Sequence, residues 1–148
     1  MEAANPYLTF DGNTEEAFEF YKAVFGGEFE VLVRFKDMGG GPPGATPDEL
    51  NRVAHVALPV GPNLLMASDT IPSMGHAHTP GNNVAIALAP SDGAEADRLF
   101  AGLAKGGTVH MEPQRTEWAE KYSNFVDRFG VHWMISYAGD VQFQPPKG

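Results

Sequence analysis

The alternation of apolar and polar positions in residues 7–27 predicts a short strand, a turn and an amphipathic helix. A set of apolar side chains in this segment recurs at the spacing that places residues on one face of a helix. These residues are Ala17, Phe20, Tyr21, Val24 and Phe25. Asn13 is expected to cap the helix, with Glu16 completing a capping box. Gly26-Gly27 supplies the glycine stop that ends helices.

The same pattern returns in the second half of the chain. Asp92 occupies the place of Asn13, Glu95 that of Glu16, and Gly106-Gly107 closes the helix. The matching apolar positions are Ala96, Leu99, Phe100, Leu103 and Ala104. A repeated cap, stop and apolar face favour an internal duplication. The alternative is two unrelated strand–helix units built on a similar template.

The remaining pattern predicts strands, loops and two hairpins. Strands are expected over 28–36, 53–60, 63–69, 83–89, 108–113, 122–129 and 131–137. Turns at Gly61-Pro62 and Gly130 join two pairs of them as hairpins. Residues 37–51 are so rich in glycine and proline that no regular element is expected there, which leaves a functional cover or a disordered loop. A helical turn is possible around residues 116–120.

Each half therefore reads strand, helix, strand, strand, strand, which predicts an α+β fold. Two such βαβββ modules would form a curved mixed eight-stranded sheet with helices on the outer face and a cleft within. We expect one domain over residues 1–148. Its first module covers about 5–70, a linker about 70–82, the second module about 83–138 and a tail 139–148.

Composition narrows the function. The net charge of −9 argues against nucleic acid and anionic membrane partners, and the lack of cysteine removes disulfides and thiolate metal sites. The first residues lack the features of a signal peptide, and no apolar run is long enough to span a bilayer, so a cytoplasmic protein is expected. No GxSxG turn is present, and neither of the two strand–helix junctions carries a GxGxxG nucleotide loop.

Three stretches resemble a known family. YLTFDGNTEEAFEFYKAVFGGEF from Tyr7, HVALPVGPNLLMASD from His55 and WAEKYSNFVDRFGVHW from Trp118 look like the PhnB-like branch of the vicinal-oxygen-chelate superfamily. That superfamily includes glyoxalase I, extradiol dioxygenases and bleomycin-resistance proteins. The resemblance implies the paired βαβββ fold and a homodimer. It also implies a divalent metal held by His, Glu or Gln from the first and last strand of each half.

The metal-ligand positions match that family pattern poorly. The residues at or next to them are Asn5, Pro6, Tyr7, Leu65, Ala67, Asn83, Trp133, Met134 and Ile135. Apolar side chains cannot replace imidazole or carboxylate ligands. No metal is therefore assigned, although a divalent ion held by unusual ligands such as His55 and Asp69 stays possible. His76 and His78 are expected to be an exposed pair in a loop.

Candidate residues for a ligand-binding cleft are polar or aromatic groups near strand ends. They are His55, Asp69, Arg115, Trp118, Tyr122 and Trp133. Arginine and aromatic side chains suit an anionic or planar ligand. The alternatives are a core or proton-transfer role for His55, a turn-capping role for Asp69, and core or interface packing for Trp118 and Trp133. No catalytic residue is assigned.

Three functions remain open. The chain could bind a small organic molecule without a metal, as bleomycin-resistance proteins do. It could be a metal-dependent lyase, isomerase or dioxygenase acting on vicinal oxygens. It could also be a structural or regulatory dimeric partner protein. The first is preferred because plausible metal ligands are lacking and aromatic residues surround the predicted cleft.

Overall fold

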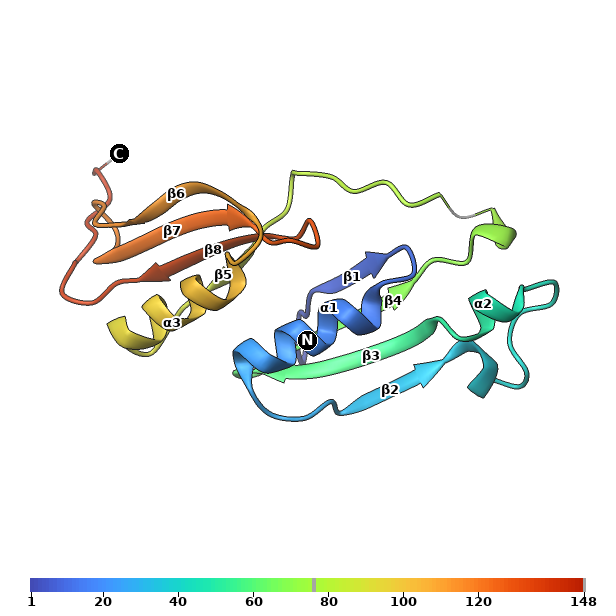
Figure 1. Ribbon diagram of the computed structural model, residues 1–148. Helices are drawn as coiled ribbons and strands as arrows, with labels where there is room; N and C mark the ends of the chain where they lie inside the picture. Colours follow the sequence, from blue (N-terminus) through green and yellow to red (C-terminus); the bar gives the residue numbers. More distant parts are fainter. Residues whose placement is uncertain (76, 148) are drawn as a thin grey trace. The chain divides into compact units, whose positions relative to one another are not determined.

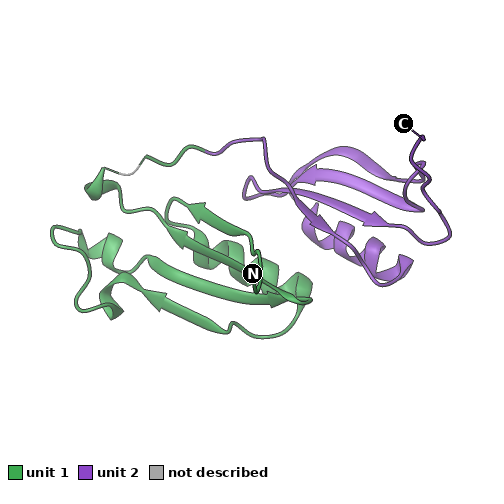
Figure 2. Cartoon of the chain, turned by 180° about the vertical axis from the view of Figure 1, so that it is seen from behind, with its two compact units in different colours: residues 1–79 green, residues 80–148 purple. Residues whose placement is uncertain are grey.

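A computed structural model describes residues 1–75 and 77–147. The chain forms two compact units, residues 1–79 and 80–148, which we call unit one and unit two (Figure 2). The boundary between Thr79 and Pro80 falls inside the segment expected to be a linker. Each unit is described by itself.

Among its described residues, unit one contains four strands, two α-helices and two short 3₁₀ helices (Figure 1). In chain order these are β1 (Tyr7–Phe10), α1 (Thr14–Phe25), β2 (Val31–Arg34), η1 (Phe35–Asp37), α2 (Pro47–Leu50), β3 (Val53–Val60), β4 (Asn63–Asp69) and η2 (Pro72–Met74). The sheet order is β1-β4-β3-β2, with β1 parallel to β4 and the other pairs antiparallel.

Unit two repeats this arrangement with one helix. Its elements are β5 (Ile86–Leu88), α3 (Gly93–Leu103), β6 (Thr108–Gln114), β7 (Lys121–Val126) and β8 (His132–Tyr137). The sheet order β5-β8-β7-β6 has the same pattern of parallel and antiparallel pairs as unit one. The predicted α+β fold of two βαβββ modules is confirmed. Its eight strands are divided into two sheets of four, each with hydrogen bonds between its own strands.

The N-terminus of α1 is capped by a distant residue rather than by Asn13. Asn13 makes no side-chain capping bond. Instead, Asp69 Oδ1 at the end of β4 accepts hydrogen bonds from the backbone N–H groups of Gly12 (2.9 Å) and Thr14 (3.1 Å) and from the Thr14 hydroxyl (2.6 Å). The predicted capping box of Asn13 and Glu16 was therefore wrong. A buried carboxylate takes the place of this capping box. Its negative charge is stabilised by the positive N-terminal end of the helix dipole.

The buried face of α1 is centred one position away from the predicted face. Ala17 and Tyr21 are fully buried as predicted, but Phe18 is fully buried as well. Phe18 makes edge-on ring contacts with Phe10 of β1 and with Tyr21. Phe20, Val24 and Phe25 are only half-buried. Because Thr14 is drawn down to Asp69, the inward face follows Thr14, Ala17, Phe18 and Tyr21 at helical spacing.

Helix α3 begins where its local sequence signals predict. The Asp92 carboxylate accepts a hydrogen bond from the backbone N–H of Glu95 (2.8 Å), and the Glu95 carboxylate accepts one from the N–H of Ser91 (2.8 Å). The predicted cap is confirmed. Ala96, Leu99 and Leu103 are buried against the sheet, also as predicted.

The largest differences between prediction and structure lie in three segments. The strand expected over 28–36 is limited to β2, because η1 turns the chain at Phe35 and the Asp37 carboxylate accepts from the Arg34 N–H (3.0 Å). The segment 37–51, expected to lack regular structure, contains α2, which begins with the capping box of Thr46 and Glu49. Around residues 116–120 the chain makes a turn closed by a Thr116 N–H to Ala119 carbonyl bond, not a helix.

We predict that Asp69→Ala lowers the free energy of unfolding by about 3 kcal/mol, because several buried donors lose a charged acceptor. Asn13→Ala should change it by less than about 0.5 kcal/mol, as for a surface position without a partner. Urea unfolding followed by circular dichroism measures both variants. Equal losses at the two sites would contradict the assignment of the cap to Asp69 alone.

Candidate functional site

Each sheet has one face covered by its helix and one opposite face, which we call the open face of that unit. Cross-strand partners point to the same side of a sheet. In β4, Leu65, Ala67 and Asp69 are buried on the α1 side, so Met66 and Ser68 belong to the open face. The other open-face positions of unit one, assigned from the strand pairing, are Tyr7, Thr9, Val31, Val33, His55, Ala57, Pro59 and Leu64.

Tyr7 and His55 form a pair on the open face of unit one. The Tyr7 hydroxyl lies 3.0 Å from His55 Nδ1. Their rings are nearly parallel, at 16° with centroids 5.6 Å apart. Tyr7 comes from β1 and His55 from β3, so the pair spans β4, which lies between these strands in the sheet. His55 is among the cleft residues predicted from the sequence, whereas Tyr7 is not.

The open face of unit two carries a second cluster of ring and amide groups. Trp118 packs edge-on against Tyr122, with centroids 5.3 Å apart. The Asn124 amide lies 3.4 Å from the Tyr122 hydroxyl. Trp118 is 45% exposed, and the Thr116 hydroxyl holds its turn by accepting from the N–H groups of Trp118 and Ala119. The structure thus brings together two predicted residues, Trp118 and Tyr122, and adds Asn124.

Trp133 lies on the helix side of the second sheet. It is 1% exposed, and its indole N–H donates to Asp127 Oδ2 at 2.8 Å. Asp127 Oδ1 also accepts from the N–H groups of Phe129 and Val131 in the turn between β7 and β8. This position corresponds to the packing alternative for Trp133. Arg115, which directly follows β6, is exposed and pairs with the exposed Asp140 at 2.9 Å.

His55 and Asp69 lie on opposite faces of the first sheet. His55 reaches Tyr7 on the open face, whereas Asp69 accepts hydrogen bonds from the start of α1 and, through Oδ2, from the Val53 N–H (2.9 Å). The two side chains therefore cannot share an ion within one unit.

The positions that the resemblance assigns to metal ligands do not supply a matching donor set. Leu65, Ala67, Trp133 and Ile135 are buried on the helix sides, and Met134 is a half-buried thioether. Among the described residues, no group of three or more His, Asp or Glu side chains is placed to hold a metal ion. Of the predicted loop pair, His76 lies outside the described residues and His78 is exposed.

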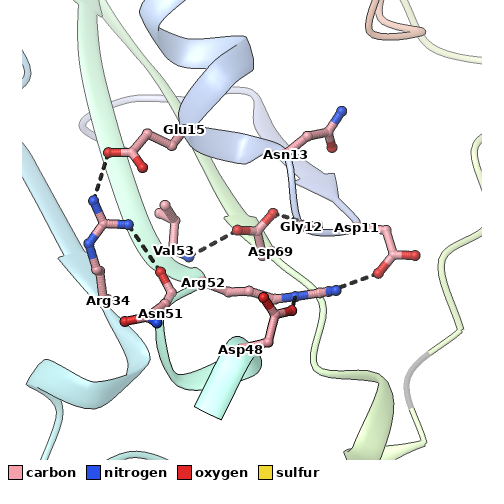
Figure 3. A pocket seen from close by; sticks show the side chains of 10 residues that line it. All are labelled: Asp11, Gly12, Asn13, Glu15, Arg34, Asp48, Asn51, Arg52, Val53 and Asp69. Carbon is pink, nitrogen blue, oxygen red and sulfur yellow. Dashed lines mark hydrogen bonds and ion pairs between the residues drawn. The ribbon is translucent and has the colours of Figure 1, made fainter. Parts of the chain in front are cut away.

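A polar hollow of about 350 Å³ opens beside the N-terminus of α1 (Figure 3). It is lined by Asp11, Gly12, Asn13, Glu15, Arg34, Asp48, Asn51, Arg52, Val53 and Asp69. Arg34 pairs with Glu15 at 2.7 Å, and Arg52 pairs with Asp11 at 2.9 Å (Figure 3).

These ion pairs shift the pKa values of the lining groups. The Thr70 hydroxyl and the Arg52 guanidinium donate to Asp11 and lower its pKa. The hydrogen bond to Glu15 raises the pKa of Arg34. Both arginines of the hollow thus pair with its acidic side chains, and Asp69 is satisfied by Thr14 and backbone N–H groups. This arrangement suits a structural role at the junction of α1, β2 and β3.

Glu49 ties α2 to the segment that follows β4. It is 5% exposed, and its two carboxylate oxygens accept from the backbone N–H groups of Thr46 and Ser73, both at 2.9 Å. The Ser73 bond and then the Thr46 bond lower the pKa of Glu49 to about 2. The residues Thr-Pro-Asp-Glu at 46–49 are a local signal for a helix start. The prediction of a loop over 37–51 rested instead on the glycine and proline residues that precede them.

Known proteins place the chain in a family. A family model for the Glyoxalase/Bleomycin resistance protein/Dioxygenase superfamily matches residues 4–135. The chain therefore belongs to this superfamily, as the resemblance of its sequence predicts. Among the described residues no helix is long and apolar enough to cross a membrane.

Several relatives share nearly the whole fold. Protein YjdN of Escherichia coli strain K12 is 31% identical over 143 residues, which is 89% of this chain and 92% of YjdN. The crystal structure of protein PA1353 from Pseudomonas aeruginosa is 38% identical with a TM-score of 0.80, covering 90% of this chain and 96% of PA1353. A PhnB protein from Bacillus cereus, at 23% identity and a TM-score of 0.73, covers 91% of this chain and 98% of its own, and shows likeness of fold.

We predict that Glu49 makes stability depend on pH in acid. Since the pKa of Glu49 falls from 4.5 to about 2 on folding, its carboxylate stabilises the folded chain above pH 4.5, and this contribution is lost as the pH falls towards 2. Glu49→Gln should therefore lose less of its thermal stability than the wild type over that range. Glu117→Gln, at an exposed position, is the control. Parallel melting temperature curves for wild type and Glu49→Gln would contradict the assignment.

Proposed function

We propose that this member of the glyoxalase superfamily binds a small planar organic molecule against its open sheet faces, without needing a divalent ion. The observation that carries the proposal is the cluster of Trp118, Tyr122 and Asn124 on the open face of unit two. Two aromatic rings at an edge-on angle present apolar surface to a planar ligand, and the amide adds a donor and an acceptor.

The part of the proposal that concerns the metal rests on the types of side chain present. The strand positions on the open face of unit one include a single imidazole, His55, and no carboxylate. Hard and borderline divalent ions require several oxygen or nitrogen ligands. A metal-dependent lyase, isomerase or dioxygenase would need ligands of these types at positions where the chain has Leu65, Ala67 and Met134.

The homodimer and the cytoplasmic location expected from the sequence remain part of this proposal. The dimer comes from the superfamily resemblance alone. Light scattering on the purified full chain measures its mass in solution, and a monomer of 15.9 kDa would remove the dimer from the proposal.

We predict that benzoate and benzyl alcohol quench the tryptophan fluorescence of the chain, whereas cyclohexanecarboxylate, which is not planar, does so weakly. Trp118 is the responsive group because the other tryptophan, Trp133, is buried. Tyr122→Leu should weaken binding roughly two- to tenfold, the range expected for loss of one aromatic contact.

Tyr137→Leu is the matched control, because Tyr137 lies in the same sheet but its strand position points to the helix side. If Tyr137→Leu and Tyr122→Leu weakened binding equally, the open face of unit two would not be the binding surface.

We further predict that chelation leaves binding unchanged. Benzoate affinity should be the same in EDTA and after incubation with zinc, nickel, manganese or iron followed by dialysis. Elemental analysis of the chain, purified without a histidine tag, accompanies the titration. One retained ion per chain, together with benzoate binding that EDTA abolishes, would replace the metal-free proposal with the metal-dependent one.

A further inference from the structure

The Tyr7–His55 pair differs from the other side-chain contacts of unit one because it is on the open face and reaches across a strand. Tyr7 is 49% exposed and His55 is half-buried. Between β1 and β3, β4 contributes Met66 and Ser68 as the register partners of Tyr7 and Thr9. The pair is therefore built on three adjacent strands of a rigid sheet, which fixes the geometry of both rings.

The hydrogen bond determines which nitrogen of His55 carries the proton. A phenol is a stronger acid than a neutral imidazole N–H, and an imidazole nitrogen is a stronger base than a phenol oxygen. The Tyr7 hydroxyl is therefore the donor and His55 Nδ1 the acceptor at 3.0 Å. In the neutral ring the proton must then be on Nε2, because the bond made by one nitrogen fixes the tautomer.

The Nε2–H group has no hydrogen-bond partner among the described residues. The contacts of His55 are the bond and the ring stacking with Tyr7. The positions near it on the open face are neutral, since Val33 is its register partner on β2 and Ala57 and Met66 follow in the next row. A single oriented N–H donor in a mainly apolar surface selects an oxygen acceptor on an otherwise apolar molecule.

We propose that the Tyr7–His55 pair is a binding site for the carboxylate or carbonyl oxygen of a small organic ligand. His55 donates from Nε2 to that oxygen. Tyr7 acts as a positioning residue, which holds the imidazole in the Nε2–H tautomer and nearly parallel to its own ring. The inference rests on the proposed function, in which a small molecule binds to an open sheet face. It adds the chemical group of that molecule that the site recognises.

The test uses the full chain labelled with ¹⁵N in its histidine rings, at mildly alkaline pH where imidazole is neutral. Two-bond ¹H–¹⁵N spectra report each ring nitrogen, and His55→Gln assigns the His55 signals. Benzoate and benzamide, which offer an oxygen acceptor, should shift the Nε2 signal of His55. Benzylamine, whose charged head group is only a donor, should leave it in place.

Tyr7→Phe keeps the ring and removes the hydroxyl. It should move the Nδ1 signal of His55 and weaken benzoate binding at this site roughly three- to tenfold, the effect of one hydrogen bond. Thr9→Val is the matched control, because it removes a hydroxyl from the same face of the same strand. It should leave the Nδ1 signal and the affinity unchanged.

Two results would overturn the inference. One is a shift of the Nε2 signal by benzylamine as large as that by benzoate. The other is a Tyr7→Phe chain with unchanged Nδ1 signal and benzoate affinity. The Trp118 fluorescence titration separates this failure from that of the proposed function, since quenching of Trp118 without a response at His55 would leave the latter standing.

Discussion

Unit one depends on the hydrogen bonds that the buried carboxylate of Asp69 accepts. Its oxygens accept from the N–H groups of Gly12 and Thr14 at the N-terminus of α1 and from the N–H of Val53 at the start of β3. One side chain at the end of β4 thus fixes a helix and a neighbouring strand. Because α1 is held on that side of the sheet, the opposite side is left for Tyr7 and His55.

The two units use the same topology but different polar groups. In unit two the helix is capped locally by Asp92, and the buried carboxylate is Asp127, which shapes the β7–β8 turn and holds the indole of Trp133. On the open faces, His55 and Asn124 belong to corresponding inner strands, β3 and β7. The two units share one scaffold, which carries an imidazole on one unit and an amide on the other.

The sequence was informative for several elements whose determinant is local, although the local capping box of Thr46 and Glu49 was missed. The bounds of β3 and β4 were predicted to the residue, and the cap of α3 lies within one turn of the chain. It was uninformative where a residue far away in the chain determines how a helix is capped or which of its faces is buried. The Asp69 cap depends on tertiary contact, which no periodicity reports, and the burial of Phe18 follows from it.

The prediction of candidate site residues was limited in the same way, because it could not include tertiary contacts. Trp133 belongs to the run VHWMISY, in which neighbouring positions are apolar on both faces, so alternation could not say which side of the sheet it takes. Tyr7 and His55 are separated by 48 residues, and their contact follows only from the order of strands in the sheet. Trp118 and Tyr122, which are close in sequence, were found together.

The different caps of the two helices have a consequence for how the chain acquires its structure. In α3, the N–H of Glu95 donates to the carboxylate of Asp92, three residues away. The N–H groups of Gly12 and Thr14 donate to Asp69, which lies 57 and 55 residues further along the chain. Closing so long a loop costs entropy before any contact stabilises it. On the ribosome, where the N-terminal part of a chain emerges first, α1 is synthesised early but completed only after residue 69 has left the exit tunnel. The first helix to be made is therefore stabilised late.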